Sequence, residues 1–316
     1  MLIWCLSIVS FVIIAVLVTS YICFREVFYI SEKEKQKRAA HIIPNAKASA
    51  NYRNQIIAWQ EQMDLIPHET VQIKSFDGLT LSGIFYEFKK GAPVELMLHG
   101  YKGNSRRNFC GAVIRASKFG HNVLLIDQRG NGKSDGHTIT FGIKESRDAV
   151  SWINYLEERF GNNIEILLAG VSMGAATALM SIERGLPSSV KWIIADCGYS
   201  TPKAIMKDVA KKRKLPATFL YPFIRLGALL FGRFDPEEIT PLDAVKKSPV
   251  PILFVHGDTD AFVPCYMSEE NYNACTSKKK LLIIKGASHG LAYYTSPDEY
   301  ENAIRLFFEL PQEHMT

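Results

Sequence analysis

Gly170-Val171-Ser172-Met173-Gly174 lies between an apolar run, Ile164 to Ala169, and a run of small residues, Ala175 to Met180. This order predicts a strand, an abrupt turn and then a helix. A serine hydroxyl becomes a good nucleophile only when a neighbouring base takes its proton, so such a serine must stand out at a tight turn within reach of a histidine. Gly170 and Gly174 would remove side chains that clash where strand and helix crowd together. An ordinary strand-to-helix turn has the same pattern, so the rest of the chain has to decide.

Eight short apolar runs predict strands, and the last six have the composition of buried parallel strands. The first two, joined at Asp77-Gly78, are typical of an antiparallel hairpin. The runs are Val71 to Phe76, Leu79 to Phe88, Val94 to Leu98, Asn122 to Asp127, Ile164 to Ala169, Lys191 to Ala195, Pro251 to Val255 and Lys280 to Ile284. Helical stretches separate most of them: Ser105 to Phe119, Ile143 to Phe160, Met173 to Arg184, Tyr266 to Cys275 and Pro297 to Leu310. This alternation predicts an α/β fold with a mostly parallel eight-stranded sheet and helices on both faces.

Chemically useful side chains follow the carboxyl ends of these runs. His99-Gly100-Tyr101 follows the third run, Ser172 the fifth, Asp196 the sixth, Asp260 the seventh and His289 the eighth. Ligands bind such sheets at the carboxyl ends of the strands. We therefore expect these residues to share one edge of the sheet.

Five motifs, in their order and spacing, resemble those of the α/β-hydrolase superfamily, from the first hairpin at about residue 70 to the last helix at about residue 310. The branch that the chain resembles is membrane-anchored, Bem46-like and serine-aminopeptidase-like (S33-type). The motifs are His99 to Asn104, Asp127 to Ser134, Gly170 to Gly174, His256 to Pro264 and Ala287 to Gly290. The resemblance implies that Ser172 is the nucleophile, Asp260 the acid and His289 the base of a catalytic triad.

Two other carboxylates compete with Asp260 for the role of triad acid. Asp196 follows the sixth strand, where some hydrolases place that acid, and Asp258 is two residues from Asp260. The pattern His-Gly-x-x-Asp-x-x-Val-Pro favours Asp260. The other polar residues are expected to have structural roles: His99 and His256 in loops at the site, Asp127 and Arg129 at the turn after the fourth strand, Asp148 on a helix face, and His121, His137 and His314 at the surface or in loops.

The resemblance also implies that the backbone N–H groups of Tyr101 and Met173 form the oxyanion hole. A long insertion, Tyr199 to Ser248, falls where this fold commonly grows a cap, and it is strongly apolar and aromatic. One interpretation is a lid that binds an acyl chain, and another is a cap helix that only packs on its own domain. Candidate substrate-binding residues are Tyr101, Phe219, Phe223 and Phe262.

Residues Leu2 to Phe24 carry no charged side chain, and as a helix they are long enough to cross a hydrocarbon core of about 30 Å. A cleaved signal peptide is the alternative, although no basic segment precedes the run. Lys and Arg residues follow the run and none precedes it, which predicts a single-pass anchor with the catalytic domain in the cytoplasm. The expected organisation is a transmembrane helix (1–24), a helical connector (25–66) and a hydrolase domain (67–316) with a cap at about 199–248.

The composition excludes several other classes of protein. The net charge of +5 is mild and spread along the chain, so nucleic-acid binding has little support. Six cysteines without a CxxC pair indicate free thiols in a reducing compartment. The sequence has neither a metal-binding constellation nor a Gly-rich dinucleotide fingerprint, so we expect no metal and no cofactor.

The sequence therefore predicts a membrane-anchored serine hydrolase that cleaves a small or lipid-like ester or thioester through an acyl-serine intermediate, with water as the second substrate. The alternatives are an aminopeptidase-like serine peptidase and a non-catalytic binding protein on the same fold. The acyl length, the leaving group and the oligomeric state stay open.

Overall fold

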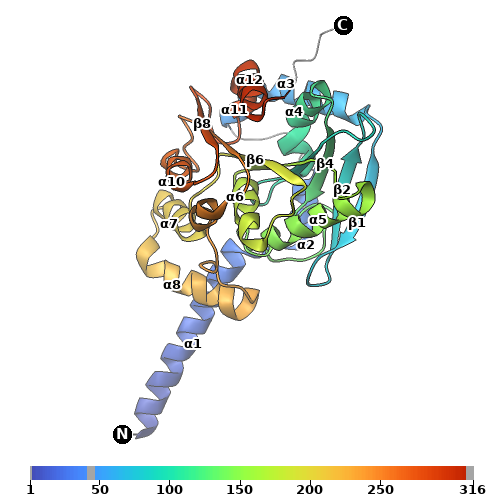
Figure 1. The fold of residues 1–316 in the computed structure, drawn as a ribbon. Helices are drawn as coiled ribbons and strands as arrows, with labels where there is room; N and C mark the ends of the chain where they lie inside the picture. The colour runs from blue at the N-terminus through green and yellow to red at the C-terminus, as the bar shows by residue number, and fades with distance from the viewer. Residues whose placement is uncertain (1, 41–46, 311–316) are drawn as a thin grey trace.

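The computed structural model describes residues 2–40 and 47–310 and contains one eight-stranded sheet (Figure 1). The strand order is β1-β2-β4-β3-β5-β6-β7-β8. The pairs β1–β2 and β2–β4 are antiparallel, and all other neighbours are parallel. The strands are β1 (Glu69–Lys74), β2 (Thr80–Tyr86), β3 (Val94–Leu98), β4 (Asn122–Asp127), β5 (Ile166–Val171), β6 (Val190–Asp196), β7 (Ile252–Gly257) and β8 (Lys279–Ile284). The predicted fold class is confirmed.

The ends of several strands differ from the prediction by one or two residues, and β5 shows why. The strand continues past Ala169, because Gly170 still pairs with Leu98 of β3 and Ala195 of β6. The sequence pattern assigned Gly170 to the turn. The strand therefore runs directly up to Ser172, and no loop residue separates the sheet from the turn.

Helices cover both faces of the sheet and bury one apolar cluster on each. One layer holds α5 (Glu145–Phe160), α6 (Met173–Met180) followed by η2 (Ser181–Arg184), and α10 (Tyr266–Ala274). The other holds α3 (Arg53–Asp64), α4 (Ser105–Lys118), α11 (Ala292–Thr295) and α12 (Pro297–Phe308). Ile56 and Met63 of α3 are buried in the second cluster, and Trp59 packs beside them. Helix α3 therefore packs on the domain.

The buried strand β3 carries one charge, and His121, in the loop before β4, is one of its partners. Glu95 is completely buried and accepts hydrogen bonds from Arg115 and from Nδ1 of His121, the latter at 3.0 Å. His121 is therefore a core residue, because a buried carboxylate needs donors around it. His137 is exposed, as expected, and His314 lies outside the described residues.

The turn after β4 is held by polar side chains, as the sequence suggested. Asp127 accepts hydrogen bonds from Ser105 Oγ and from the backbone N–H of Lys133. Arg129 is buried and pairs with Asp148 at 2.6 Å and with Asp77 at 2.9 Å. Asp148 does lie on helix α5, but it is buried against Arg129 and does not belong to a solvated face.

The N-terminal helix α1 (Leu2–Val27) projects from the domain beside the cap (Figure 1). Ile3–Val27 is long and apolar enough to cross a membrane, with a mean hydropathy of 2.5 and only 6% of its apolar window buried. A signal sequence would have the same properties. The helix extends past Phe24, the predicted end, because its last turns pack on the domain: Phe24 and Phe28 are buried in a third apolar cluster. The short helices α2 (Glu32–Ala40) and η1 (Lys47–Tyr52) follow.

The cap lies between β6 and β7, where the insertion was expected. It contains α7 (Pro202–Lys212), α8 (Ala217–Gly227), η3 (Ala228–Gly232), α9 (Pro241–Ala244) and η4 (Val245–Lys247). The end of α8 touches α1 so closely that a Cβ atom at Gly227 would overlap the carbonyl oxygen of Ser20. The rings of Tyr21 and Phe231 meet edge to face at 5.1 Å. The cap and the membrane-type helix therefore form one packed unit.

Candidate active site

Ser172 stands at a strained turn between β5 and α6. Its backbone has φ 58° and ψ −119°, a conformation that residues other than glycine rarely adopt. A Cβ atom at Gly170 would overlap the carbonyl of Gly174, and one at Gly174 would overlap the carbonyl of Leu98. The prediction that both glycines permit a close approach of backbone is confirmed.

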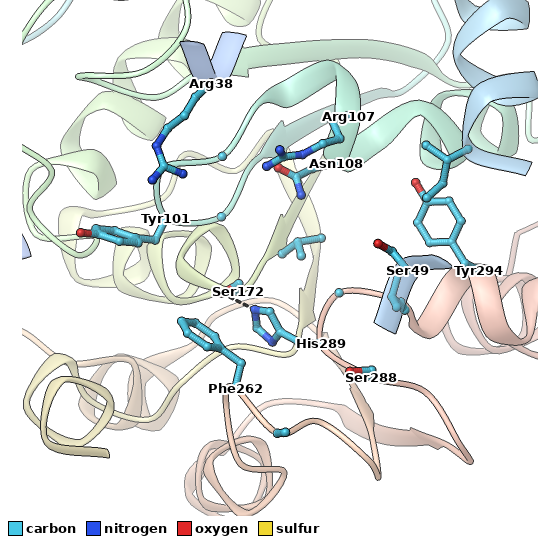
Figure 2. Close-up of a pocket in the computed structure, with 17 residues that line it drawn as sticks. Arg38, Ser49, Tyr101, Arg107, Asn108, Ser172, Phe262, Ser288, His289 and Tyr294 are labelled. Atoms are coloured by element: carbon cyan, nitrogen blue, oxygen red, sulfur yellow. Dashed lines mark hydrogen bonds between the residues drawn. The ribbon is translucent and has the colours of Figure 1, made fainter. Parts of the chain in front are cut away.

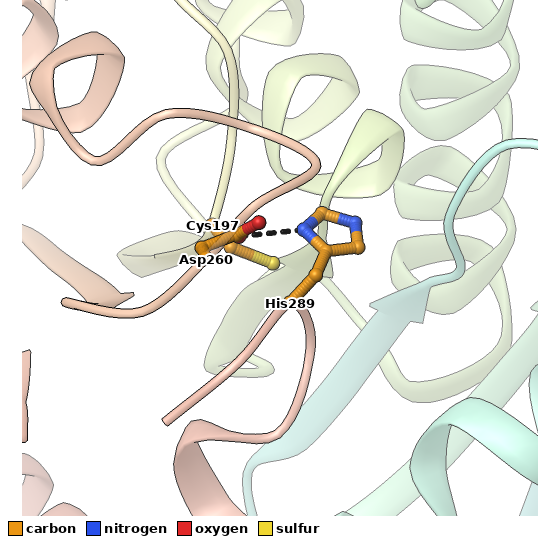
Figure 3. Close-up of side chains that lie close together, drawn as sticks. All are labelled: Cys197, Asp260 and His289. Atoms are coloured by element: carbon orange, nitrogen blue, oxygen red, sulfur yellow. Dashed lines mark hydrogen bonds and ion pairs between the residues drawn. The ribbon is translucent and has the colours of Figure 1, made fainter. Parts of the chain in front are cut away.

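A continuous chain of hydrogen bonds joins three side chains from distant parts of the sequence. Nε2 of His289 lies 2.9 Å from Oγ of Ser172, and its Nδ1 lies 2.7 Å from Oδ2 of Asp260. Dashed lines mark the first contact in Figure 2 and the second in Figure 3. The other carboxylate oxygen of Asp260 accepts hydrogen bonds from the backbone N–H groups of Phe262 and Val263 at 2.8 and 2.9 Å. The carboxylate is thus fixed on one side and faces the imidazole on the other.

Asp260 is held in its charged form. Burial raises the pKa of this carboxyl, but hydrogen bonds from His256 and His289 outweigh burial and keep the pKa well below its usual range. Nε2 of His256 lies 3.3 Å from Asp260 and 2.9 Å from the carbonyl of Val263, while its Nδ1 contacts Ser268 Oγ at 2.7 Å. The sequence assigned His256 to loop organisation and missed its contact with the carboxylate. Its place four residues before Asp260, in the same motif, was the available signal.

The two rival carboxylates are engaged elsewhere. Asp258 accepts a hydrogen bond from the backbone N–H of Gly286 at 2.6 Å. Asp196 is buried, and one of its oxygens accepts a hydrogen bond from Tyr300 Oη at 3.1 Å. The other oxygen of Asp196 has no hydrogen-bond partner among the described residues. Burial raises the pKa of Asp196 to about 6.

This raised pKa makes the stability of the protein depend on pH. Above its folded pKa, Asp196 is ionised in a buried place; below an unfolded pKa of about 3.9 it is neutral in both states. Its contribution to stability is therefore fully present below pH 4 and is lost as the pH rises through about 6. Between pH 4 and 7, we expect the wild type to lose up to about 3 kcal/mol of its free energy of unfolding through this group. The Asp196→Asn protein should not show this loss. Urea unfolding at several pH values measures this, and an identical pH dependence in both proteins would contradict it.

Among the described residues, one group of three His, Cys, Asp or Glu side chains has ligand atoms close enough to share a metal ion. It consists of Cys197, Asp260 and His289, whose candidate ligand atoms all lie within 4.8 Å of one another (Figure 3). The imidazole and the carboxylate are already joined by their hydrogen bond. Burial raises the pKa of the Cys197 thiol well above its usual range, whereas a metal ligand has to be a thiolate. The cluster therefore fits a thiol packed against the Asp260–His289 pair better than it fits a metal site.

Two backbone segments lie close to Ser172. Helix α6 begins at Met173, so the N–H of Met173 has no acceptor within its helix. The backbone of Gly100 approaches Ser172 closely, since a Cβ there would lie 3.4 Å from Ser172 Cβ. Buried His99 holds this loop: its Nδ1 contacts the carbonyl of Gly100 at 2.7 Å, and its Nε2 accepts from the N–H of Gln128 at 3.0 Å. The role expected for His99 in loop organisation is confirmed.

Two cavities meet at Ser172. The first, the basic cavity, has a volume of about 730 Å³, and its lining includes Arg38, Arg107 and His289 (Figure 2). The second, the apolar cavity, has a volume of about 350 Å³ and lies between α1, α7 and α8. Tyr101 and Phe262 line both cavities.

Phe219 and Phe223, which were expected to contact substrate, line neither of these two cavities. Phe219 is 66% exposed, and its ring packs on that of Phe223 at 5.4 Å. Residues four apart share one face of a helix, and this pair occupies the outer face of α8. The inner face presents Leu220 and Ile224 to the apolar cavity instead.

A family model described as the alpha/beta hydrolase fold matches residues 94–232, which include β3, the turn at Ser172 and much of the cap. The chain has the α/β-hydrolase fold. Among the proteins that this chain is similar to is YqkD of Bacillus subtilis, described as uncharacterized. The two are 27% identical over 60% of this chain and 63% of YqkD, a little under two thirds of that protein. Protein bem46 of Schizosaccharomyces pombe is 25% identical over 67% of both chains.

Among solved structures, this chain is similar to the esterase Pf2001 of Pyrococcus furiosus. The TM-score is 0.64 at 24% identity, covering 79% of this chain and 92% of the esterase. At this identity the similarity concerns the fold. The chemistry of this protein has to be inferred from its own residues.

Proposed function

We propose that this protein is a membrane-anchored serine hydrolase that cleaves carboxylic esters or thioesters through an acyl-serine intermediate. The observation that carries the proposal is the pair of hydrogen bonds of His289, 2.9 Å to Ser172 and 2.7 Å to Asp260. A base within hydrogen-bond reach of a hydroxyl, oriented by a third group, is the arrangement that activates a serine. The esterase fold of Pf2001 is consistent with this chemistry.

Each residue would have a defined task in the reaction. His289 takes the proton of Ser172 as Oγ attacks the acyl carbon, and it returns that proton to the leaving alcohol or thiol. Asp260 holds Nδ1–H of the imidazole and stabilises the imidazolium. The backbone N–H groups of Tyr101 and Met173 bind the oxyanion. Water, activated by His289, then releases the acid and restores the serine.

The basic cavity favours ester or thioester cleavage over aminopeptidase activity. An aminopeptidase has to bind the ammonium group of its substrate, for which a carboxylate is the natural partner. The described residues that line the basic cavity include Arg38 and Arg107 but no Asp or Glu. A free amino terminus would therefore meet positive charge next to Ser172.

Helix α1 would anchor the protein, with its exposed apolar side chains in the bilayer and the catalytic domain on the cytoplasmic side. Support for the anchor comes from its length and composition, together with the packing of its last turns on the domain, which a cleaved signal sequence would not need. The Lys and Arg residues that follow the helix support the orientation.

A fluorophosphonate probe tests the chemistry directly. We expect the full chain in detergent micelles to be labelled at Ser172, as identified by mass spectrometry of the labelled peptide. We also expect it to hydrolyse p-nitrophenyl acetate faster than aminoacyl anilides. Labelling at another serine, or no labelling, would contradict the assigned nucleophile, and a preference for anilides would favour the peptidase.

A further inference from the structure

The two cavities at Ser172 have opposite chemical character. The apolar cavity is lined by Ile22 and Val27 of α1, by Ile205 and Val209 of α7, and by Leu220 and Ile224 of α8. Its charged lining residues, Glu26 and Arg213, are exposed and lie at its rim. A cavity of about 350 Å³ with apolar walls suits a hydrocarbon chain.

The basic cavity carries an excess of positive charge. Arg38 and Arg107 both point into it (Figure 2). Glu34 lies 2.8 Å from Arg38 and 3.4 Å from Lys102, so one carboxylate serves two cations. Arg107 has no ion-pair partner within residues 2–40 and 47–310; burial and then the charge of Arg38 lower its pKa. The single carboxylate of Glu34 therefore cannot balance the charge of the two guanidinium groups and Lys102. The excess of positive charge makes the cavity a site for an anion.

The position of His289 determines which cavity takes which half of the substrate. The imidazole must reach the leaving oxygen or sulfur in order to protonate it. His289 lines the basic cavity and not the apolar one, whereas Ser172 lines both. The leaving group therefore belongs in the basic cavity, and the acyl chain belongs in the apolar cavity.

The apolar cavity is walled by the helix that is long enough to span a membrane. The hydroxyl of Tyr101 donates a hydrogen bond to the carbonyl of Val27, the last residue of α1, at 2.6 Å. This bond ties the end of α1 to the loop beside the nucleophile. The cap also exposes apolar side chains on α8 and η3 and just before α8, namely Leu215, Phe219, Leu229, Leu230 and Phe231. Contact with a bilayer would cover this surface and bring the apolar cavity to the level of the lipid.

We propose that the substrate is a fatty acyl ester or thioester of an anionic alcohol or thiol. Its acyl chain passes from the bilayer into the cavity between α1 and the cap, and its leaving group lies between Arg38 and Arg107. This assignment rests on the proposed function. Oγ of Ser172 bonds to the acyl carbon as the C–O or C–S bond breaks, and His289 transfers the serine proton to the leaving atom. Water then adds to the acyl carbon, releases the fatty acid and returns a proton to Ser172 through His289.

The acyl half is tested with p-nitrophenyl esters of two to sixteen carbons and the full chain in neutral detergent micelles. Val209→Trp and Leu220→Trp place a large ring in the apolar cavity, at positions where the native side chain is partly exposed. We expect kcat/KM for the dodecanoate to fall at least about tenfold and kcat/KM for the acetate to stay unchanged, since only the long chain loses apolar contacts. Phe219→Trp, on the outer face of α8, is the matched control and should leave both values unchanged.

The outcomes separate this inference from the proposed function. An equal loss for acetate and dodecanoate, or no loss for either, would overturn the placement of the acyl chain while leaving a working serine hydrolase. If the wild type hydrolysed neither ester and bound no fluorophosphonate, the proposed function itself would be wrong.

The leaving-group half is tested with three dodecanoyl substrates: the coenzyme A thioester, the 1-acyl-glycerol 3-phosphate and the neutral 1-acyl-glycerol. For Arg107→Gln and Arg38→Gln we expect kcat/KM to fall about 10- to 100-fold for one or both phosphate-bearing substrates and to stay unchanged for the neutral one. The affected substrate identifies a lipid or a soluble source of the anion. Arg106→Gln is the control, since Arg106 pairs with Asp64 and lines neither cavity. Equal effects on all three substrates, or no effect, would overturn the anion site.

Discussion

Replacing Ser172 by alanine is expected to lower kcat for p-nitrophenyl acetate by about a millionfold. Losing the nucleophile of a serine triad removes the acyl-enzyme route altogether, and the remaining site accelerates hydrolysis only modestly. The fold should survive, because the only side-chain hydrogen bond that the hydroxyl makes within the described residues is the one to His289. Alanine keeps the Cβ atom and leaves the strained backbone at this position as it is. The measurement is kcat, with circular dichroism to establish the fold.

Ser288→Ala is the matched control for this variant. Ser288 also lines the basic cavity and directly precedes His289 in the chain. The hydrogen bond of His289 Nε2, however, joins Ser172 and not Ser288. We expect its kcat to stay within a few-fold of the wild type. A Ser172→Ala protein that folds and keeps more than a hundredth of the wild-type kcat would show that another group performs the attack.

The fold could be predicted from local patterns, and the resemblance to the α/β-hydrolase motifs selected Ser172, Asp260 and His289 among the residues that follow strand ends. Apolar runs of strand length alternate with helical stretches, and Ser172, Asp260 and His289 each come after a strand whose carboxyl end lies at the same edge of the sheet. The two glycines that flank Ser172 also carry a local signal, since no other residue fits where the backbones nearly touch.

What the sequence could not reveal depends on how helices are rotated and on contacts between distant segments. The aromatic residues of α8 are conspicuous in the sequence, but Phe219 faces outward and the less conspicuous Leu220 faces the cavity. Likewise, Arg38 follows the membrane-type helix and Arg107 lies on α4, and only the folded chain brings them to one cavity. The burial of His121 in its loop was not predicted, because its buried partner Glu95 is hidden inside an apolar run.

Asp260→Asn should lower kcat by about ten-thousandfold while leaving the fold intact. The reason is that the two carboxylate oxygens have different hydrogen-bond partners. The backbone N–H groups of Phe262 and Val263 donate to Oδ1, so an amide would place its oxygen there. Its NH₂ group would then occupy the position of Oδ2 and donate to Nδ1 of His289, 2.7 Å from that oxygen. The imidazole would carry its proton on Nε2, facing Ser172, and could no longer accept the serine proton.

The rival carboxylate provides the control for this change. Asp258→Asn should leave kcat within a few-fold of the wild type, because Asp258 is bonded to the backbone of Gly286 and not to the imidazole. The NMR signal of the imidazole N–H would report the tautomer directly. The wild type should show the proton on Nδ1, and Asp260→Asn should show it on Nε2. If Asp260→Asn kept the wild-type kcat while Asp258→Asn lost it, the acid would be Asp258. If the tautomer changed with no loss of kcat, His289 would not be the base, since a base whose accepting nitrogen is protonated cannot activate Ser172.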